Sequence, residues 1–304
     1  MVDSRAYQDQ ARLLVRVLPY VAREKVFALK GGTAINLFLR PMPRLSVDID
    51  LTYLPITGRE ESLADCRQAL ARIGQGLEST SPQIATVQQI AGKEGLRLLV
   101  SEGRTRIKVE VNPVIRGTIE SPEMLDIHPA VEEQFGFASM PVLAKPDLYG
   151  GKICAALDRQ HPRDLFDIML LLREDGLTRT VFDGFLVYLI SHNRSIGDLL
   201  APRMADLADM FTNQFQGMTH EPVQLGELEK ARTDLLKRVS ELMTADDKTF
   251  LLSVKKGEPQ WSLINVDGVE SLPAVQWKLQ NLSEMDTKRR HQAVRRLESV
   301  LHRI

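Results

Sequence analysis

The stretch from residue 26 to residue 53 constrains the fold more than any other part of this chain. A short apolar run at residues 26–29 stops at Gly31 and Gly32, residues 33–40 favour a helix, and residues 45–53 favour a second strand. A helix that begins where a strand ends presents unpaired N–H groups and a partial positive charge there. Glycine also lets the backbone approach a ligand closely. The stretch therefore predicts a phosphate-binding turn, to which the side chain of Thr33 adds a hydroxyl.

Asp48 and Asp50 are separated by one residue in the second predicted strand, so their side chains lie on the same side of it. Two carboxylates on one side repel each other unless a divalent cation lies between them, and Mg²⁺ prefers carboxylate and phosphate oxygens. We therefore predict that both aspartates bind Mg²⁺ or Mn²⁺. The simpler alternatives are a solvent-facing strand edge for the two acids and an ordinary tight turn for Gly31 and Gly32.

Residues 106–112 alternate strictly between apolar and polar side chains, which predicts a strand with Lys108 and Glu110 on one face. If this strand lies beside the one that carries Asp48 and Asp50, Glu110 completes a three-carboxylate metal site and helps to activate an attacking hydroxyl. The alternative is an amphipathic strand whose polar face is solvated.

A second group of charged side chains lies on predicted helices between residues 145 and 167. If its helix face lines the cleft, Lys152 would hold the phosphates of a nucleotide and offset negative charge in a transition state. Asp164 and Asp167 are three residues apart and share a helix face, from which they would hold Lys152 or Arg159 in place. The alternative is an ordinary pair of helices joined by salt bridges.

The chain has mixed α/β character over residues 1–118 and favours helices over residues 119–304. We predict an α+β fold in two parts: residues 1–118 form a core with the metal and phosphate site, and residues 119–304 form a helical region that completes the nucleotide and acceptor cleft. Further strands are expected at 84–90, 96–101 and 106–111 with turns at Gly92, Gly95 and Gly103, and helices at 4–22, 58–73, 146–157, 162–173, 180–191, 196–215, 226–243, 246–255, 273–285 and 286–301.

The 39 basic and 40 acidic residues leave no overall charge to attract nucleic acid, so a phosphate-binding surface must be formed locally. Cys66 and Cys154 lack the spacing of a zinc site or a disulfide framework, and suit a reducing compartment. No apolar run approaches the ~20 residues of a membrane span, and the first residues lack the apolar core of a signal peptide. We expect a cytoplasmic protein without a membrane partner. The basic residues at 288–291 and 295–296 form either a solvated helix face or an RNA contact.

The motif Gly-Gly-Thr-Ala-x-Asn-Leu at Gly31, followed by Asp-x-Asp-Leu at Asp48, resembles the DNA-polymerase-beta-like nucleotidyltransferase superfamily. The fuller resemblance is to the AbiEii/AbiGii toxin family, which also has a lysine on a helix and a Lys/Arg-Asp-x-x-Asp motif, here Lys152 and residues 163–167. The resemblance covers most of the chain. It implies a polymerase-beta-like core, a small mixed sheet with helices, followed by a mostly helical C-terminal region. It also implies the toxin of a type IV toxin–antitoxin pair, with a cognate antitoxin encoded nearby.

These observations predict Mg²⁺-dependent transfer of a nucleoside monophosphate from an NTP to a hydroxyl, with release of pyrophosphate. The resemblance implies RNA as the acceptor, at the 3′ end of tRNA. The alternatives are a small-molecule transferase of the antibiotic-modifying kind and a non-catalytic, nucleotide-binding regulatory module. The predicted site residues are Asp48, Asp50 and Glu110 at the metal, Gly31, Gly32, Thr33, Lys152 and Asp164 at the nucleotide, and Asp167 as the partner that orients the lysine.

Overall fold

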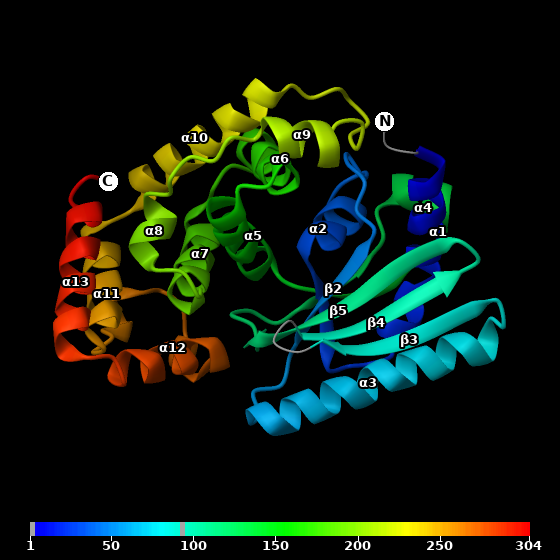
Figure 1. The fold of residues 1–304 in the computed structure, drawn as a ribbon, viewed down its shortest axis with the longest axis horizontal. Coiled ribbons are helices and arrows are strands. Elements are labelled where there is room, and N and C mark those ends of the chain that lie inside the picture. Colours follow the sequence, from blue (N-terminus) through cyan, green and yellow to red (C-terminus); the bar gives the residue numbers. More distant parts are fainter. Residues whose placement is uncertain (1–3, 92–94) are drawn as a thin grey trace. The chain divides into compact units, whose positions relative to one another are not determined.

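The computed structural model describes residues 4–91 and 95–304, which form two compact units. The N-terminal unit comprises Met1–Ala144 and Gln216–Pro222, and the helical unit comprises Lys145–Phe215 and Val223–Ile304. The turn predicted at Gly92 lies outside the described residues. Figure 1 traces both units along the chain.

The N-terminal unit is built on a seven-stranded mixed sheet with the strand order β3-β4-β5-β2-β1-β7-β6. Neighbouring strands are antiparallel, except that β1 pairs with β7 and β2 with β5 in parallel. The sheet confirms the predicted α+β class. Its strands are β1 (Phe27–Lys30), β2 (Asp48–Tyr53), β3 (Ile84–Ala91), β4 (Gly95–Glu102), β5 (Thr105–Arg116), β6 (Glu123–Asp126) and β7 (Ser139–Val142).

Two long helices, α1 (Ser4–Val21) and α3 (Arg59–Thr80), pack against the sheet and against each other. In Figure 1 the second of them runs along β3 and β4. The helical spacing of apolar residues in α1 predicts its buried face correctly, since Leu14 and Leu18 are fully buried. Burial of these faces forms the hydrophobic core beneath β2, β4 and β5.

The helix after β1 begins two residues earlier than predicted. It comprises α2 (Gly31–Thr33) and a π-helical continuation, η1 (Ala34–Leu39). Asn36 donates a side-chain hydrogen bond of 2.8 Å to the carbonyl of Gly32, which fastens the first turn. Strand β2 begins at Asp48 rather than at residue 45, because the backbone N–H of Leu45 donates to Met218 in the returning segment instead of joining the sheet.

The expected division at residue 118 differs from the observed one. Residues 119–144 contribute β6, the short helix α4 (Pro129–Phe135) and β7 to the N-terminal unit. Strand β7 pairs with β1 through Leu29 and Val142, partners that are far apart in sequence. Four-residue strands that pair with distant partners show little local pattern, so the sequence does not predict them. The helical region therefore begins at Lys145 rather than at residue 119.

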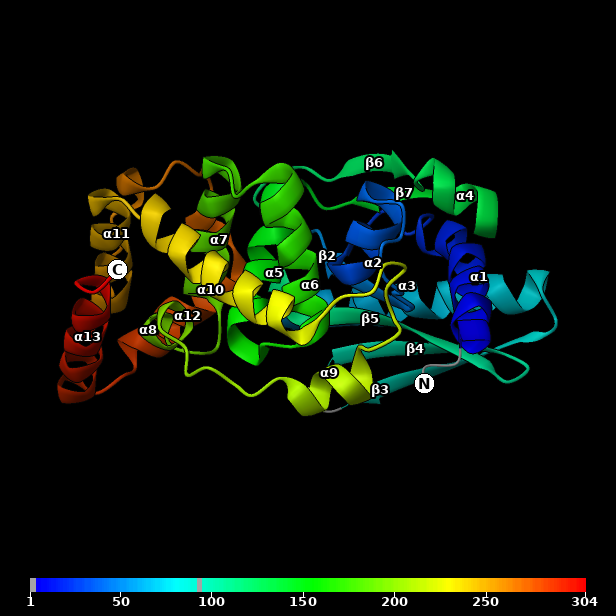
Figure 2. The same ribbon diagram turned by 90° about the horizontal axis from the view of Figure 1, so that it is seen from above.

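The helical unit is organised around α5 and α7, which pack closely and lie side by side in Figures 1 and 2. A Cβ added at Gly184 would lie 2.3 Å from the carbonyl oxygen of Pro146, so only glycine permits this approach. The helices are α5 (Lys145–Arg159), α6 (Pro162–Leu170), α7 (Arg179–Ser191), α8 (Ile196–Leu200), α9 (Ala208–Gln214), α10 (Leu225–Leu242), α11 (Ala245–Lys256), α12 (Pro273–Ser283) and α13 (Thr287–Leu301).

The single helix predicted at 196–215 is wrong, because the chain forms α8 and α9 with an irregular link between them. Pro202 follows α8 and cannot continue its hydrogen-bond ladder. Asp206 then accepts a hydrogen bond of 2.9 Å from the backbone of Ala208, where α9 begins. Within residues 4–91 and 95–304, no helix has both the length and the apolar character that crossing a membrane requires.

Candidate active site

Strand β2 presents Asp48 and Asp50 on the side opposite Ile49 and Leu51. The two apolar side chains are fully buried and both aspartates are partly exposed, as the alternation predicts. Asp50 lies opposite Lys30 in the β1–β2 register, and α2 begins at the next residue. The strand pairing therefore brings a carboxylate to the start of the helix.

Gly31 is held in the left-handed region with φ of 76°, where other residues are strained. A Cβ added there would lie 2.8 Å from Oδ2 of Asp50. At Gly32 an added Cβ would lie 2.6 Å from Nη2 of Arg44 and 2.9 Å from Oγ of Ser46. A side chain at Gly31 would be strained by the backbone conformation and would displace the Asp50 carboxylate, whereas one at Gly32 would displace the ends of the Arg44 and Ser46 side chains.

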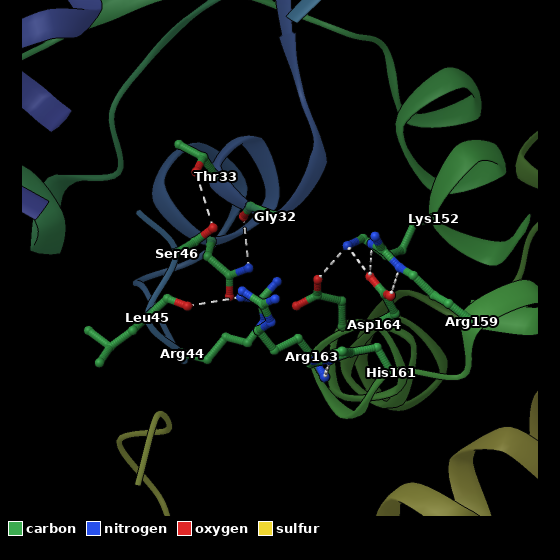
Figure 3. Close-up of polar contacts among 12 residues, drawn as sticks. Gly32, Thr33, Arg44, Leu45, Ser46, Lys152, Arg159, His161, Arg163 and Asp164 are labelled. Carbon is green, nitrogen blue, oxygen red and sulfur yellow. Dashed lines mark hydrogen bonds and ion pairs between the residues drawn. The ribbon is translucent and has the colours of Figure 1, made fainter. Parts of the chain in front are cut away.

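Thr33 is buried, and its hydroxyl donates a short hydrogen bond to the backbone carbonyl of Asp48. The same hydroxyl lies 3.1 Å from Oγ of Ser46 (Figure 3). These contacts join the start of the helix to the start of β2. The Thr33 hydroxyl therefore helps to fix Asp48 in place.

Strand β5 lies parallel to β2, with Asp48 opposite Lys108 and Asp50 opposite Glu110, so the expected proximity of Glu110 is present. Nζ of Lys108 lies 3.5 Å from Oδ2 of Asp48 and 3.4 Å from Oε2 of Glu110. Arg97 of β4 contacts Oε1 of Glu110 at 3.1 Å. The two oxygens of Glu110 thus face two cations.

The assignment of Glu110 as a third metal ligand stays a prediction. Among residues 4–91 and 95–304, no group of three or more His, Cys, Asp or Glu side chains could hold a metal ion. In the structure Glu110 pairs with Arg97 and Lys108, which are more favourable electrostatic partners than another carboxylate. Asp48 and Asp50 remain as a pair of oxygen donors. Such a pair fits Mg²⁺, which one or two carboxylates commonly hold together with substrate phosphates.

The contact of Arg97 with Glu110 was not predicted from the sequence. The turn expected at Gly103 could have predicted this contact. Glu102 and Thr105 pair across the turn, and the same antiparallel register places Arg97 opposite Glu110. The sequence places Lys108 on the same face as Glu110, but its proximity to Asp48 depends on a pairing between β2 and β5, which are distant in sequence.

In the helical unit, Lys152 of α5 forms ion pairs with both aspartates of α6, and Figure 3 shows its contact with Asp164. Its Nζ lies 3.0 Å from Oδ1 of Asp164 and 2.9 Å from Oδ2 of Asp167. All three side chains are buried, with at most 6% of their surface exposed. Arg159 adds two hydrogen bonds to Asp164, of 2.6 and 3.0 Å. Both aspartates thus fix the position of the lysine ammonium, which is the geometry the spacing of α6 predicts.

Electrostatics in this cluster favour the charged form of Asp164. Burial alone would raise the pKa of its carboxyl, but the charges and hydrogen bonds of Lys152 and Arg159 outweigh burial and hold the pKa well below its ordinary value. The positive charges of Lys152 and Arg159 balance the negative charges of the two aspartates of α6. His161 caps α6 by accepting a 3.1 Å hydrogen bond from the backbone of Arg163.

A mixed sheet that presents two aspartates beside a Gly-Gly helix start defines the nucleotidyltransferase class of protein. The chain belongs to the AbiEii family, since residues 12–281 match the family described as "Nucleotidyl transferase AbiEii toxin, Type IV TA system". This confirms the predicted resemblance and identifies a nucleotidyltransferase toxin of a type IV toxin–antitoxin system. Membership implies an antitoxin partner and an NTP substrate, and nucleotidyltransferases of this kind generally use a divalent metal ion.

The fold is similar to that of the nucleotidyltransferase toxin MenT4 from Mycobacterium tuberculosis H37Rv, with a TM-score of 0.58. The two sequences are 14% identical, and the similarity covers 97% of this chain and 93% of MenT4. A search of curated protein sequences gave no significant match. At this identity the likeness bears on the fold, which agrees with the family assignment.

Proposed function

We propose that the protein transfers a nucleoside monophosphate from an NTP to the 3′ end of tRNA in the cytoplasm, in a reaction that depends on Mg²⁺. The observation that carries this proposal is the position of Asp48 and Asp50 on one side of β2, next to the helix start at Gly31. Carboxylates suit a divalent cation, and the helix start suits the phosphates that such a cation accompanies.

In the N-terminal unit, we assign Asp48 and Asp50 as the metal ligands. When bound, Mg²⁺ would offset the charge of the phosphate oxygens and favour departure of pyrophosphate. The backbone at Gly31 and Gly32 contacts the terminal phosphates of the NTP, and Thr33 holds this turn against β2. These assignments draw on backbone groups and carboxylates that the fold already holds in fixed positions.

Glu110 is assigned a positioning role, because both of its oxygens are paired with cations. It holds Lys108 within 3.5 Å of Asp48, where the ammonium reduces repulsion between the carboxylates of β2. The charge of Lys108 would also attract the phosphates of an incoming nucleotide.

In the helical unit, we assign Lys152 to the phosphates of the NTP, with Asp164 and Asp167 as the residues that orient it. A buried ammonium with two fixed carboxylate partners loses little conformational freedom when it meets a ligand. The cluster therefore suits a role in which a cation must be placed accurately against developing negative charge.

The reaction balances as a single substitution at phosphorus. The oxygen of the acceptor hydroxyl attacks the α-phosphorus of the NTP, and the bond from that phosphorus to the oxygen bridging the β-phosphate breaks. Pyrophosphate leaves, and the hydroxyl proton passes to solvent. In this scheme the residues of the chain bind, orient and stabilise charge, which is the main catalytic task in phosphoryl transfer.

The test is incubation of the protein with each α-³²P-labelled NTP and total RNA, followed by sequencing of the RNA 3′ ends. We expect label on tRNA and extra nucleotides at its acceptor end. Parallel reactions with aminoglycosides test the small-molecule alternative, and calorimetry with Mg²⁺ and NTP tests the regulatory module. Label on an aminoglycoside alone, or nucleotide binding without any transfer, would contradict the proposal.

A further inference from the structure

A second group of basic side chains surrounds a cavity in the helical unit, where α13 packs against α8 and α11 (Figures 1 and 2). The cavity has a volume of about 370 Å³, within the range of roughly 300–1,000 Å³ of small-ligand sites. It therefore has room for a phosphate and the sugar attached to it. Its polar lining residues are Ser195, Asp198, Lys255, Arg289, Gln292 and Arg296.

Lys255 is the most unusual residue of this lining. It is only 8% exposed, yet within residues 4–91 and 95–304 its ammonium has neither a hydrogen-bond nor an ion-pair partner. The C-terminal end of α11 favours a cation both here and at the neighbour Lys256, but the Lys255 side chain is largely buried and that of Lys256 is exposed. An ammonium on a largely buried side chain at the wall of a cavity is stabilised when an anion binds there.

The charges around Lys255 also favour binding of an anion, because they are mainly positive. Asp198 is the one carboxylate of the lining, and Arg296 already binds it at 2.5 Å. Lys278 of α12 adds a partly buried positive charge close to Lys255, and among the residues that the structure describes its ammonium donates to the backbone carbonyls of His192 and Arg194. Burial lowers the pKa of Lys255, and the charge of Asp198 only partly opposes that effect. Arg289 contributes an exposed guanidinium to the same cavity.

We propose that this cavity binds a phosphate group, with the Lys255 ammonium as its buried contact and Arg289 and Arg296 as outer contacts. Phosphate matches the site because it carries negative charge and several acceptor oxygens, whereas the lining offers mainly cationic donors. The two arginines are seven residues apart, about 10 Å along the helix axis. A ligand with several phosphates can contact both arginines at once, whereas a single phosphate ion is too small to span that distance.

The source of the phosphate that best fits these observations is the backbone of an RNA chain. An RNA strand can place one phosphate at Lys255 and neighbouring ones near the exposed arginines. This part of the inference rests on the proposed function, in which RNA is the acceptor. The cavity would then be a docking point for the acceptor RNA, separate from the aspartates of β2.

The test measures binding of fluorescein-labelled tRNA to the full chain by anisotropy, without NTP, across a series of salt concentrations. Lys255→Gln removes the buried charge, and Lys256→Gln removes the adjacent exposed charge as a matched control. A second pair, Arg289→Gln and Arg295→Gln, compares a lining arginine of α13 with an exposed arginine outside the lining. The second pair keeps the test decisive if Lys255→Gln fails to fold, because Arg289 and Arg295 are exposed.

We expect Lys255→Gln and Arg289→Gln each to weaken tRNA binding about tenfold and to reduce the salt slope by about one. Lys256→Gln and Arg295→Gln should change affinity less than about twofold. Equal effects within each pair would overturn the proposal. Inorganic phosphate should raise the melting temperature of the wild type more than that of Lys255→Gln. If phosphate does so while tRNA affinity is unchanged, RNA is excluded as the source.

A labelling assay with α-³²P NTP on the wild-type protein, run beside the binding measurement, separates this inference from the proposed function. tRNA binding that depends on Lys255 but is not followed by any nucleotide transfer would support the cavity and contradict the proposed activity. Transfer to tRNA with identical affinities for Lys255→Gln and Lys256→Gln would support the activity and overturn the cavity.

Discussion

Asp50 of β2 lies directly opposite Glu110 of β5 in the parallel strand pair, yet the two carboxylates have different environments. Glu110 faces the cations of Arg97 and Lys108, whereas Asp50 lies against the space left by Gly31. In the proposed function these two neighbouring carboxylates have different roles: Asp50 binds the metal ion, and Glu110 holds Lys108 near Asp48.

We predict that Glu110→Gln lowers kcat for nucleotide transfer by roughly 10–100-fold, the usual effect of losing a residue that orients a ligand. The KM for NTP should change much less, because the residues assigned to the phosphates are untouched. Steady-state kinetics with labelled NTP measures both values. Glu123→Gln, an exposed strand residue of β6, is the control and should behave as wild type. A loss as large as that of Asp48→Asn would mean that Glu110 acts directly in the reaction.

Gly31→Ala should abolish most of the activity at a modest cost in stability. The added Cβ would lie 2.8 Å from Asp50 Oδ2 and must displace that carboxylate. The matched control is Gly103→Ala, because Gly103 also has a positive φ, of 58°, but nothing lies within 4 Å of an added Cβ. Each substitution should cost roughly 1–2 kcal/mol in urea unfolding. Comparable activity in the two variants would argue against the importance of the Gly31–Asp50 approach.

The ion pair between Lys152 and Asp167 is predicted to be energetically coupled. Removing one partner leaves an uncompensated buried charge, so Lys152→Met or Asp167→Asn alone should lower the free energy of unfolding by about 3 kcal/mol. The double variant should lose less than the sum, with a coupling energy on the order of 1–3 kcal/mol. Urea denaturation of all four proteins measures this cycle. Additive losses would show that the two side chains contribute independently.

The stability contribution of Lys278 should depend on pH. Burial and, to a lesser degree, the charge of Lys255 lower its pKa to about 8, from an unfolded value of about 10.4. The unfolded chain therefore binds more protons at this site between those values, and stability rises with pH there. The difference in unfolding free energy between wild type and Lys278→Gln should be flat below pH 8. It should shift in favour of the wild type from about pH 8 to about pH 10. A constant difference would contradict the lowered pKa.

The parts of the fold that follow local patterns were predicted correctly from the sequence. Strand β1, the Gly-Gly helix start and the two aspartates of β2 each depend on a few consecutive residues, whose periodicity and glycines specify the backbone. The same holds for Lys152, Asp164 and Asp167, because spacing along two neighbouring helices fixes which faces they share.

Features that depend on distant pairing were not predicted. The grouping of Glu110 with Arg97 and Lys108 requires the registers of β4, β5 and β2 together. Strands β6 and β7 are four residues long, too short to show a period, so the sequence predicts no strands there. The break at Pro202 was missed because the apolar spacing continues on both sides of it.

The roles of Asp48 and Asp50 in nucleotide transfer are tested most directly by the initial rate at which α-³²P-labelled NTP labels tRNA. Asp48→Asn and Asp50→Asn are compared with Asp126→Asn, an exposed aspartate on β6, and circular dichroism verifies that all three variants fold. We predict a loss of roughly 10²–10³-fold or more for each β2 variant and a wild-type rate for Asp126→Asn. Folded Asp48→Asn and Asp50→Asn proteins that label tRNA at the wild-type rate would contradict the account.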